Sequence, residues 1–259
     1  KVYGLDTTSP EEFSECARDL AKKVKILVVA GGDGTLSAVV NLFDDLDEIV
    51  LGYLSAGSGN ALRYALDLPR SLKKAAKRIK TGNEHRMDLI LLDNNKKAFL
   101  ASIGIEGLIL NKRDQYISKG INRSDAYAIS VMSAMDCILG KYRIQDAKVT
   151  IDGRYINIPD TKSLIITKHP FYGFGLKVVP GAKVDDGNLH FMFVDSEILK
   201  WIYGLTTSWV GGNQDGYFVG KKIKITTKNE EFLQTDGDVV RKGASFEFEV
   251  FPKKLRIIY

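Results

Sequence analysis

The hydrophobic pattern of this chain changes near residue 90, and the change separates two kinds of predicted structure. Before it, short apolar runs alternate with segments whose apolar residues recur at helical spacing. The runs 24–30 and 49–54 are typical of strands buried on both faces, as in a parallel sheet. Helices are expected over residues 11–23, 35–46, 59–67 and 71–80. This alternation predicts an open α/β layer with right-handed crossovers.

From about residue 88 the chain consists mainly of short strand-like runs separated by turn residues. Asp152-Gly153, between two of these runs, is typical of a hairpin turn, and residues 124–139 are expected to form a helix. The strand-like runs are 88–92, 98–103, 148–151, 155–158, 164–167, 189–194, 223–226 and 246–251. We therefore predict an α/β domain over residues 1–92, followed by a mostly antiparallel β domain over residues 93–251.

The composition excludes several classes of protein. The chain has 259 residues with 37 basic and 32 acidic side chains, a net charge of +5, and 44% apolar residues fit a globular protein. The basic residues are scattered, so we expect no nucleic acid partner. No window approaches the ~18 apolar residues of a membrane-spanning helix, so no transmembrane segment is expected. The first residues do not resemble a signal peptide and the two cysteines lack metal-binding spacing, so a cytoplasmic location is expected.

A glycine-rich string, Gly31-Gly32-Asp33-Gly34-Thr35, lies between a predicted buried strand and a predicted helix. Ligands of open α/β sheets bind at the carboxyl ends of strands, where backbone amides and helix N-termini point outward. Glycines allow the backbone to approach a phosphate closely, and Thr35 is suited to capping the helix or binding a phosphate oxygen. Asp33 would repel a phosphate, so we expect it to hold Mg²⁺ or to accept a proton from a hydroxyl. The alternative is a tight turn in which Asp33 is only a cap.

A second string, Gly57-Ser58-Gly59-Asn60, follows the next predicted strand in the same way. Two neighbouring parallel strands that end in such turns would form one crevice for the polyanionic end of a nucleotide. The alternative for this turn is a helix cap without further purpose. The sequence contains neither the P-loop lysine motif nor G-x-G-x-x-G, which disfavours P-loop NTPases and ordinary Rossmann dehydrogenases.

Together these two strings resemble the diacylglycerol kinase catalytic-domain family, which includes sphingosine and ceramide kinases and bacterial lipid kinases. The resemblance continues, in the family's order, through most of the second part of the chain. It is carried there by the glycine-rich stretch 172–182 with its Pro180-Gly181-Ala182 end, by Asp185-Asp186-Gly187-Asn188-Leu189, by Thr235-Asp236-Gly237-Asp238 and by the closing segment 251–256.

The resemblance implies a fold and a reaction. An N-terminal α/β domain similar to those of NAD kinase and phosphofructokinase would bind ATP, a C-terminal β-sandwich domain would follow, and residues 252–259 would return to the first domain. The γ-phosphoryl group of ATP would be transferred, with Mg²⁺, to a lipid hydroxyl of a diacylglycerol-like or sphingoid-like acceptor. The protein would act peripherally at a membrane surface, where Phe171, Trp201 or Trp209 are candidates for docking unless the tryptophans lie in the core. The oligomeric state stays open, with a homodimer as one alternative.

The resemblance also implies roles for individual residues. Asp33, Asp236 and Asp238 would be catalytic, with Asp238 in the position of the family's presumed proton acceptor, which is usually Glu. A further cation would be held by the Asp186 carboxylate and by the carbonyls of Lys183 and Asn188, the alternative being a plain Asp-Gly turn. ATP binding would involve Thr7, Gly31, Gly32, Asp33, Gly34, Thr35, Gly57, Ser58, Gly59 and Asn60, although Thr7 has a helix cap as its alternative role.

Some features depart from the family pattern. The family's opening strand and its Asn-Pro-x-Ser-Gly phosphate loop have no counterpart in this sequence. Lys168-His169-Pro170 stands where an asparagine is common, and we expect His169 at the surface, with substrate contact as the alternative. Two other functions therefore stay open: an NAD kinase-like kinase of another small-molecule hydroxyl, or a catalytically inactive lipid- or nucleotide-binding relative.

Overall fold

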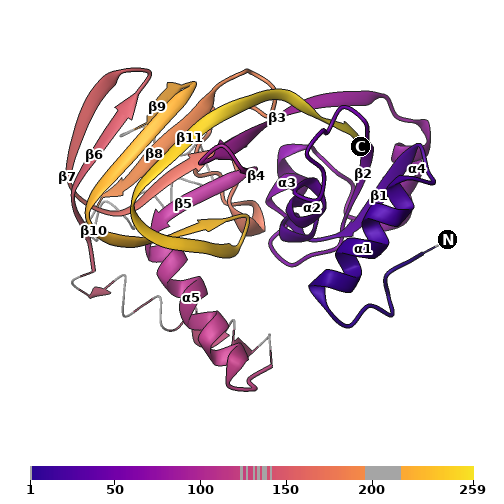
Figure 1. Ribbon diagram of the computed structural model, residues 1–259, viewed down its shortest axis with the longest axis horizontal. Coiled ribbons are helices and arrows are strands. Elements are labelled where there is room, and N and C mark those ends of the chain that lie inside the picture. Colours follow the sequence, from indigo (N-terminus) through magenta and orange to yellow (C-terminus); the bar gives the residue numbers. More distant parts are fainter. Residues whose placement is uncertain are drawn as a thin grey trace.

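The computed structural model describes residues 2–122, 125–126, 128–130, 132, 135, 139–140, 142–195 and 217–259. The chain forms an N-terminal α/β region and a C-terminal β-sandwich-like region, so the predicted fold class is confirmed. In Figure 1 the α/β region lies on the right and the strands of the second region lie on the left. The division of the chain at residues 92 and 93 stays a prediction.

The two parallel strands and four helices that the hydrophobic pattern predicted are present in the α/β region. The strands β1 (Ile26–Gly31) and β2 (Val50–Ser55) pair with Ile26 opposite Val50. Ser9 caps the first helix because its side chain accepts a hydrogen bond from the Glu12 amide, and Pro10 occupies the first helical position. The helices are α1 (Pro10–Ala21), α2 (Asp33–Val40), α3 (Ala61–Ala65) and α4 (Leu72–Thr81).

The remaining strands pair antiparallel with one another, again as predicted. They are β3 (Glu84–Leu92), β4 (Lys96–Ala98), β5 (Leu100–Gly104), β6 (Ile144–Ile151), β7 (Arg154–Thr167), β8 (Leu189–Asp195), β9 (Tyr217–Gly220), β10 (Lys222–Thr235) and β11 (Asp238–Ile258). Strands β5 and β6 both lie between β7 and β10, one beyond the other, because each pairs with a different part of these long strands. A short 3₁₀ helix, η1 (Gly173–Gly175), lies in the loop before β8.

Some local details of the second region match the predictions from the sequence, and others differ from them. The hairpin turn between β6 and β7 is made by Asp152 and Gly153 with φ angles of 47° and 84°, as its residue types predicted. The separate runs 155–158 and 164–167 form the single strand β7. Helix α5 (Ile105–Ser118) was not predicted. The helix expected over 124–139 falls partly outside the described residues.

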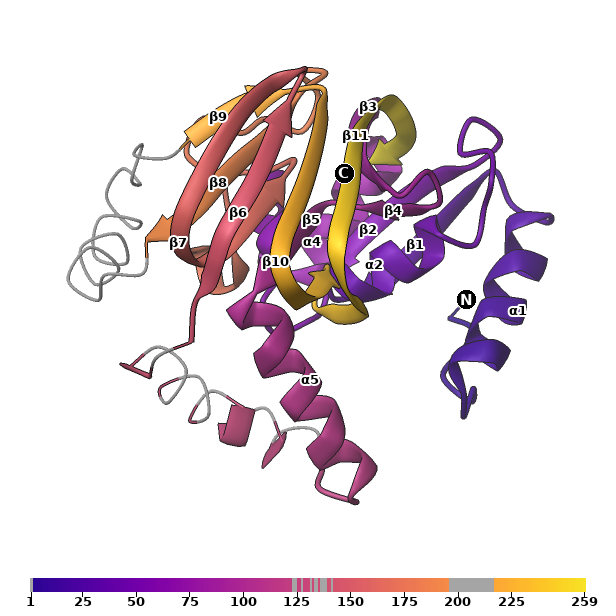
Figure 2. The same ribbon diagram turned by 60° about the vertical axis from the view of Figure 1, so that its left-hand side comes forward.

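Strand β11 links the two regions. Its first part pairs with β10, its middle and last parts pair with β3, and its end runs parallel to β2 with Ile257 opposite Leu51. The register with β3 is broken between Phe251 and Leu255, where Lys253 has a φ angle of 52°. Figures 1 and 2 show this long strand crossing from the sandwich to the α/β region. The strand therefore fixes one region against the other by main-chain hydrogen bonds.

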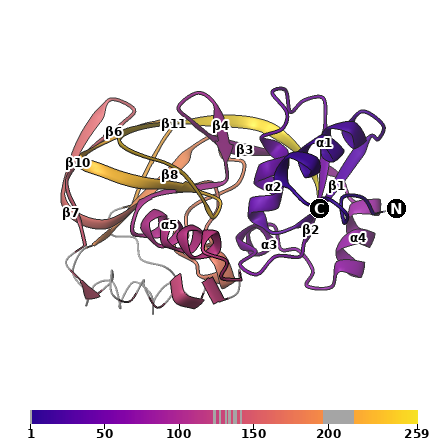
Figure 3. The same ribbon diagram turned by 60° about the horizontal axis from the view of Figure 1, so that its bottom comes forward.

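Each region has its own apolar core. Leu36, Leu51, Tyr53 and Ile257 belong to the cluster between the helices and the sheet of the α/β region. The cluster of the sandwich includes Ile103, Val149 and Phe246. Figure 3 shows α2 and α3 on the flank of the α/β region that faces α5 and the sandwich. Helix α2 begins within the first glycine-rich string and α3 begins directly after the second, so both strings lie at the junction of the two regions.

Candidate active site

The first glycine loop, residues 31–35, connects β1 to α2. Gly32 is the N-cap of α2, and its carbonyl accepts a hydrogen bond from the Thr35 amide at 3.1 Å. A Cβ atom on Gly31 would lie only 2.7 Å from the Thr35 side chain, so that position has no room for a larger residue. The loop is therefore a tight backbone turn whose following amides lie at the start of a helix, where anions are favoured.

The second glycine loop, residues 57–60, touches the first one. A Cβ atom on Gly32 would lie 3.4 Å from the Gly57 Cα, and one on Gly57 would overlap the Gly32 Cα. The Ala56 amide also donates a hydrogen bond to the Gly31 carbonyl at 2.8 Å. The predicted convergence of the two glycine loops is therefore confirmed, and it depends on the absence of side chains at both contact points.

Asp33 fastens the two loops together. Its carboxylate accepts hydrogen bonds from the Ala61 amide at 2.6 Å and the Leu62 amide at 3.3 Å, which belong to the first turn of α3. The Tyr53 hydroxyl donates a third hydrogen bond at 3.1 Å. Asp33 thus caps α3 while forming the first residue of α2. Burial raises the pKa of Asp33, and these donors oppose the rise because they favour the ionised carboxylate.

Asn60 shapes the second loop through its backbone and its side chain. It adopts a left-handed conformation with φ 46°, and its Nδ2 donates a hydrogen bond to the Gly57 carbonyl. Its Oδ1 is buried and has no hydrogen-bond partner within the described part of the chain. Ser58 is exposed at the tip of the loop. This loop consequently offers one orphaned acceptor and one free hydroxyl beside the first loop.

The turn 236–238, between β10 and β11, packs against the first loop. A Cβ atom on Gly34 would lie 3.2 Å from the Asp236 carbonyl oxygen and 3.8 Å from Asp238 Oδ2. The sequence resemblance implied catalytic roles for Asp236 and Asp238 on this turn, and the structure brings the turn to the first glycine loop. The positions of Asp33, Asp236 and Asp238 are therefore neighbouring in space although they come from two regions of the chain.

Asp236 anchors this turn from inside. Its carboxylate accepts hydrogen bonds from the Ser37 hydroxyl at 2.6 Å, the Leu100 amide at 2.9 Å and the Phe99 amide at 3.2 Å. Desolvation raises the pKa of Asp236 to about 7, against the lowering effect of these donors. Asp236 therefore ties α2 to the junction of β4 and β5, and its carboxylate oxygens are engaged within the protein.

Asp238 presents its carboxylate to solvent, with 63% of its side chain exposed. The guanidinium of Arg113, on α5, lies 3.8 Å from its Oδ1 and also donates to the Gly237 carbonyl at 3.1 Å. Asp114 provides a second carboxylate for the same guanidinium at 2.8 Å. Sequence reasoning missed Arg113 because it lies on the unpredicted helix α5, more than a hundred residues from the turn that it holds.

The segment around η1 closes over the second glycine loop. The Phe174 amide donates to the Gly59 carbonyl at 2.8 Å, and a Cβ atom on Gly59 would lie 3.5 Å from the Gly173 Cα. Phe174 has a φ angle of 62° and its side chain is largely exposed. The site thus carries an aromatic side chain in solvent directly beside the loop that follows β2.

Thr7 lies before α1 and binds locally. Its hydroxyl donates to the Gly4 carbonyl at 2.8 Å, whereas Ser9 caps the helix. The alternative in which Thr7 is the helix cap is therefore wrong. Its role toward a nucleotide stays a prediction.

The group implied to bind a second cation contains a lysine ammonium. Lys168 Nζ lies 2.8 Å from Asp186 Oδ1 and donates to the Asn188 carbonyl, two of the three oxygens expected to hold the cation. The amide nitrogen of Lys183, the third expected ligand, lies 3.4 Å from His190 Nε2. A positive charge among these oxygens opposes a metal ion there, so the arrangement does not fit the implied group. Within the described ranges, no set of three or more His, Cys, Asp or Glu side chains is arranged to hold a metal ion.

Two further expectations concerned side chains near this segment. His169 is buried rather than at the surface, so that expectation is wrong, and burial lowers its pKa to about 4. Phe171 packs against Tyr64 with ring centroids 5.7 Å apart, which occupies one face of a candidate docking residue. Trp201 and Trp209 lie outside the described residues.

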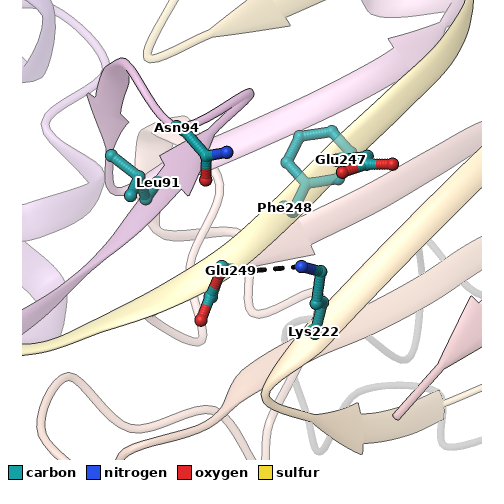
Figure 4. A pocket seen from close by; sticks show the side chains of 6 residues that line it. All are labelled: Leu91, Asn94, Lys222, Glu247, Phe248 and Glu249. Atoms are coloured by element: carbon teal, nitrogen blue, oxygen red, sulfur yellow. Dashed lines mark ion pairs between the residues drawn. The ribbon is translucent and has the colours of Figure 1, made fainter. Parts of the chain in front are cut away.

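A surface depression on the sandwich does not coincide with the converging loops. It is lined by Leu91, Asn94, Lys222, Glu247, Phe248 and Glu249 (Figure 4). Lys222 Nζ lies 3.9 Å from Glu249 Oε2 across this depression, and the depression encloses no space for a water molecule.

Among the described residues, no helix has the length and apolarity needed to cross a membrane.

Comparison with known proteins shows which family this chain resembles. The model of the diacylglycerol kinase catalytic domain matches residues 2–92, and the model of the YegS C-terminal NAD kinase beta sandwich-like domain matches residues 113–259. A putative lipid kinase YtlR of Bacillus subtilis is 26% identical over 254 residues, which cover 91% of this chain and 80% of that protein. A diacylglycerol kinase of Staphylococcus saprophyticus is 26% identical over 231 residues, 87% of this chain and 74% of that protein.

A solved structure shares the fold. A putative diacylglycerol kinase from Bacillus anthracis superposes with a TM-score of 0.74 at 19% identity and covers 98% of this chain and 83% of its own. The two glycine loops and the 236–238 turn that meet at the junction thus lie within the regions matched by the two family models. The chain belongs to the diacylglycerol kinase catalytic-domain family and is a kinase of the lipid kinase type.

Proposed function

We propose that this kinase transfers the γ-phosphoryl group of ATP to the hydroxyl of a lipid, with Mg²⁺. The observation that carries the proposal is the backbone contact of the two glycine loops with each other and with the turn that bears Asp238. Phosphoryl transfer requires positioning and charge neutralisation more than covalent chemistry by the protein. The two glycine loops and the turn that bears Asp238 supply groups for positioning the substrates and for neutralising their charge.

The nucleotide phosphates are assigned to the two glycine loops. Residues 31–35 and 57–60 bring the beginnings of α2 and α3 together, and glycines keep side chains away from the surface between them. The orphaned Asn60 Oδ1 and the exposed Ser58 hydroxyl are polar partners for the nucleotide or its water. Asp33 would act mainly by holding both loops in one geometry, because its oxygens are bound to α3 and Tyr53.

The Mg²⁺ that accompanies ATP fits the carboxylate at Asp238. Mg²⁺ is commonly bound by one or two carboxylates together with substrate phosphates, and Asp238 is the carboxylate of this turn that faces solvent. When bound, the ion would neutralise charge on the transferring phosphate. Arg113 would keep the Asp238 carboxylate oriented beside Gly34.

Proton removal from the acceptor hydroxyl is the alternative role of Asp238, because a carboxylate that binds Mg²⁺ is a much weaker base. A general base must come within hydrogen-bond reach of the hydroxyl, and Asp238 is the exposed acid nearest to the first glycine loop among the three predicted catalytic aspartates. Asp236 is instead assigned to positioning, because it accepts hydrogen bonds from Ser37, Phe99 and Leu100.

The acceptor is assigned to the lipid class, at a membrane surface reached peripherally from the cytoplasm. The net charge of +5 favours an anionic bilayer, and Phe174 offers an exposed aromatic ring beside the second glycine loop. Diacylglycerol-like and sphingoid-like acceptors both present a hydroxyl beside acyl chains, and either satisfies these features.

The test is turnover of labelled ATP in the presence of Mg²⁺ and a total lipid extract, with products identified by mass spectrometry. We expect one labelled lipid class that disappears when Mg²⁺ is omitted. Reactions with NAD and with a soluble polyol in place of lipid provide comparison arms. Label in NAD or the polyol alone would establish a different acceptor, and the absence of transfer to every acceptor would establish the inactive alternative.

A further inference from the structure

A fully buried lysine lies at the junction of the two regions. Lys168 follows β7, and its side chain has no exposed surface. Its ammonium lies 2.9 Å from Asp88 Oδ2 and 2.8 Å from Asp186 Oδ1, and it donates to the Asn188 carbonyl. An ammonium has three N–H donors, so these three acceptors satisfy it completely.

Two of these acceptors are the oxygens that a divalent cation was expected to use. We propose that the Lys168 ammonium takes the place of that cation, so that the junction is held by an internal charge and binds no metal ion. A lysine ammonium and a hard divalent cation bind the same kinds of atom, because both attract carboxylate and carbonyl oxygens. Both cannot occupy the same oxygens, because two positive charges at such a distance repel each other strongly in a buried site.

The surrounding groups favour the ammonium. The Asp186 carboxylate oxygen that contacts the ammonium, Oδ1, also accepts a hydrogen bond from the Asn188 amide at 3.1 Å. His190 Nε2 lies 2.9 Å from the other oxygen of the Asp186 carboxylate, Oδ2. Its Nδ1 lies 2.6 Å from the Tyr217 hydroxyl. Lys168 thus places one ammonium between the carboxylates of Asp88 and Asp186.

The lysine also joins elements from both regions. Asp88, on β3, is fully buried and accepts hydrogen bonds from the Gly187 amide at 2.7 Å and the Lys253 amide at 2.8 Å. Lys253 lies where β11 breaks register on its way from the sandwich to the α/β region. The ammonium therefore connects the end of β7, the 185–188 turn, β3 and the crossing of β11. The stability of this junction should not depend on divalent cations.

The test is thermal unfolding of the whole chain, without nucleotide, in EDTA and in millimolar Ca²⁺ or Mg²⁺. The wild-type midpoint should be the same in all three solutions. Lys168→Asn removes the ammonium but leaves both carboxylates, so the variant should unfold at a lower temperature in EDTA and regain stability in Ca²⁺. Lys97→Asn is the matched control, because Lys97 is also buried but donates to the Phe43 carbonyl. That variant should be destabilised without rescue by Ca²⁺.

A second measurement uses the wild-type protein alone, so it does not depend on the folding of any variant. Metal analysis after dialysis without chelator should find no stoichiometric Ca²⁺, Mg²⁺ or Mn²⁺. One retained equivalent of metal, or a wild-type midpoint that falls in EDTA, would overturn the proposal. So would a folded Lys168→Asn protein that Ca²⁺ does not stabilise. No readout involves turnover, and the result is independent of whether the proposed reaction is correct.

Discussion

The Asp33 carboxylate accepts a hydrogen bond from the Ala61 amide at 2.6 Å, across the contact between the two glycine loops. The residue that begins α2 therefore caps α3, and one carboxylate sets the relative position of two helix N-termini. A carboxylate at a helix N-terminus is favoured by the helix dipole and by the free amides there. The geometry of the proposed phosphate site consequently depends on a residue that the sequence predicted to hold Mg²⁺ or to accept a proton from a hydroxyl.

Asp33→Asn tests this dependence. The amide side chain keeps one acceptor oxygen but turns an NH₂ group toward donors that the carboxylate now satisfies, so the two loops should separate slightly. We expect kcat to fall at least ~10²-fold while the circular dichroism spectrum is retained. Asp19→Asn on α1 removes an exposed aspartate and should leave turnover unchanged. Unchanged turnover in Asp33→Asn would remove this residue from the mechanism.

Gly57→Ala tests the contact between the loops without changing any charge. The new methyl group would overlap the Gly32 Cα, and backbone atoms on both sides must move to admit it. We expect the dissociation constant for ATP, measured by titration calorimetry, to rise at least ~10-fold, about 1.4 kcal/mol. Gly153→Ala strains only the β6–β7 turn, where φ is 84°, and its methyl group meets no neighbouring atom, so this variant should bind ATP like the wild type. Equal affinity in the two variants would contradict the assignment of phosphates to the loops.

Asp238 and Asp114 provide a matched pair for the catalytic turn, because both contact Arg113 but only Asp238 lies beside Gly34. Asp238→Asn should lower kcat by ~10²–10⁴-fold, as expected for the loss of a general base. Asp238→Glu keeps the carboxylate and extends it by one methylene, so it should retain most activity. Asp114→Asn should have little effect. Similar losses in Asp238→Asn and Asp114→Asn would instead indicate that both act only by holding Arg113.

The hydrophobic pattern was sufficient to predict the first part of the fold and the meeting of the two glycine loops. Each loop follows a strand with an unbroken apolar run, and parallel neighbouring strands must end at the same edge. Helix α5 was missed because Gly107 lies in its first turn, and glycine is a poor helix former. The structure explains this glycine: a Cβ there would lie 2.7 Å from the Phe232 carbonyl oxygen, so the helix packs directly on β10.

The long-range contacts could not be predicted from local sequence. The side chain of Asp236 binds Ser37 and Leu100, and the side chain of Lys168 binds Asp88 and Asp186. These contacts depend on the way β11 crosses between the two regions. The stretch Lys168-His169-Pro170 was visible in the sequence as a departure from the family pattern, but the role of Lys168 depends on Asp88, which comes from another strand. The sequence motifs therefore identified the oxygens of Asp186 and Asn188, but they did not identify the Lys168 ammonium that binds these oxygens.

The raised pKa of Asp236, about 7, predicts a pH dependence of stability. In the unfolded chain the carboxyl has a pKa near ~3.9, so between about pH 4 and pH 7 the folded state holds the proton more tightly. The resulting stabilisation is complete below about pH 4 and is lost as the pH rises through 7. The unfolding midpoint of the wild type should therefore fall, relative to that of Asp236→Asn, between pH 5 and pH 7. The maximal slope for one group is about 1.4 kcal/mol per pH unit, which corresponds to a few °C. Thermal unfolding of both proteins in one buffer series cancels the other titrating groups, and a constant difference would show that the buried carboxyl ionises with an ordinary pKa.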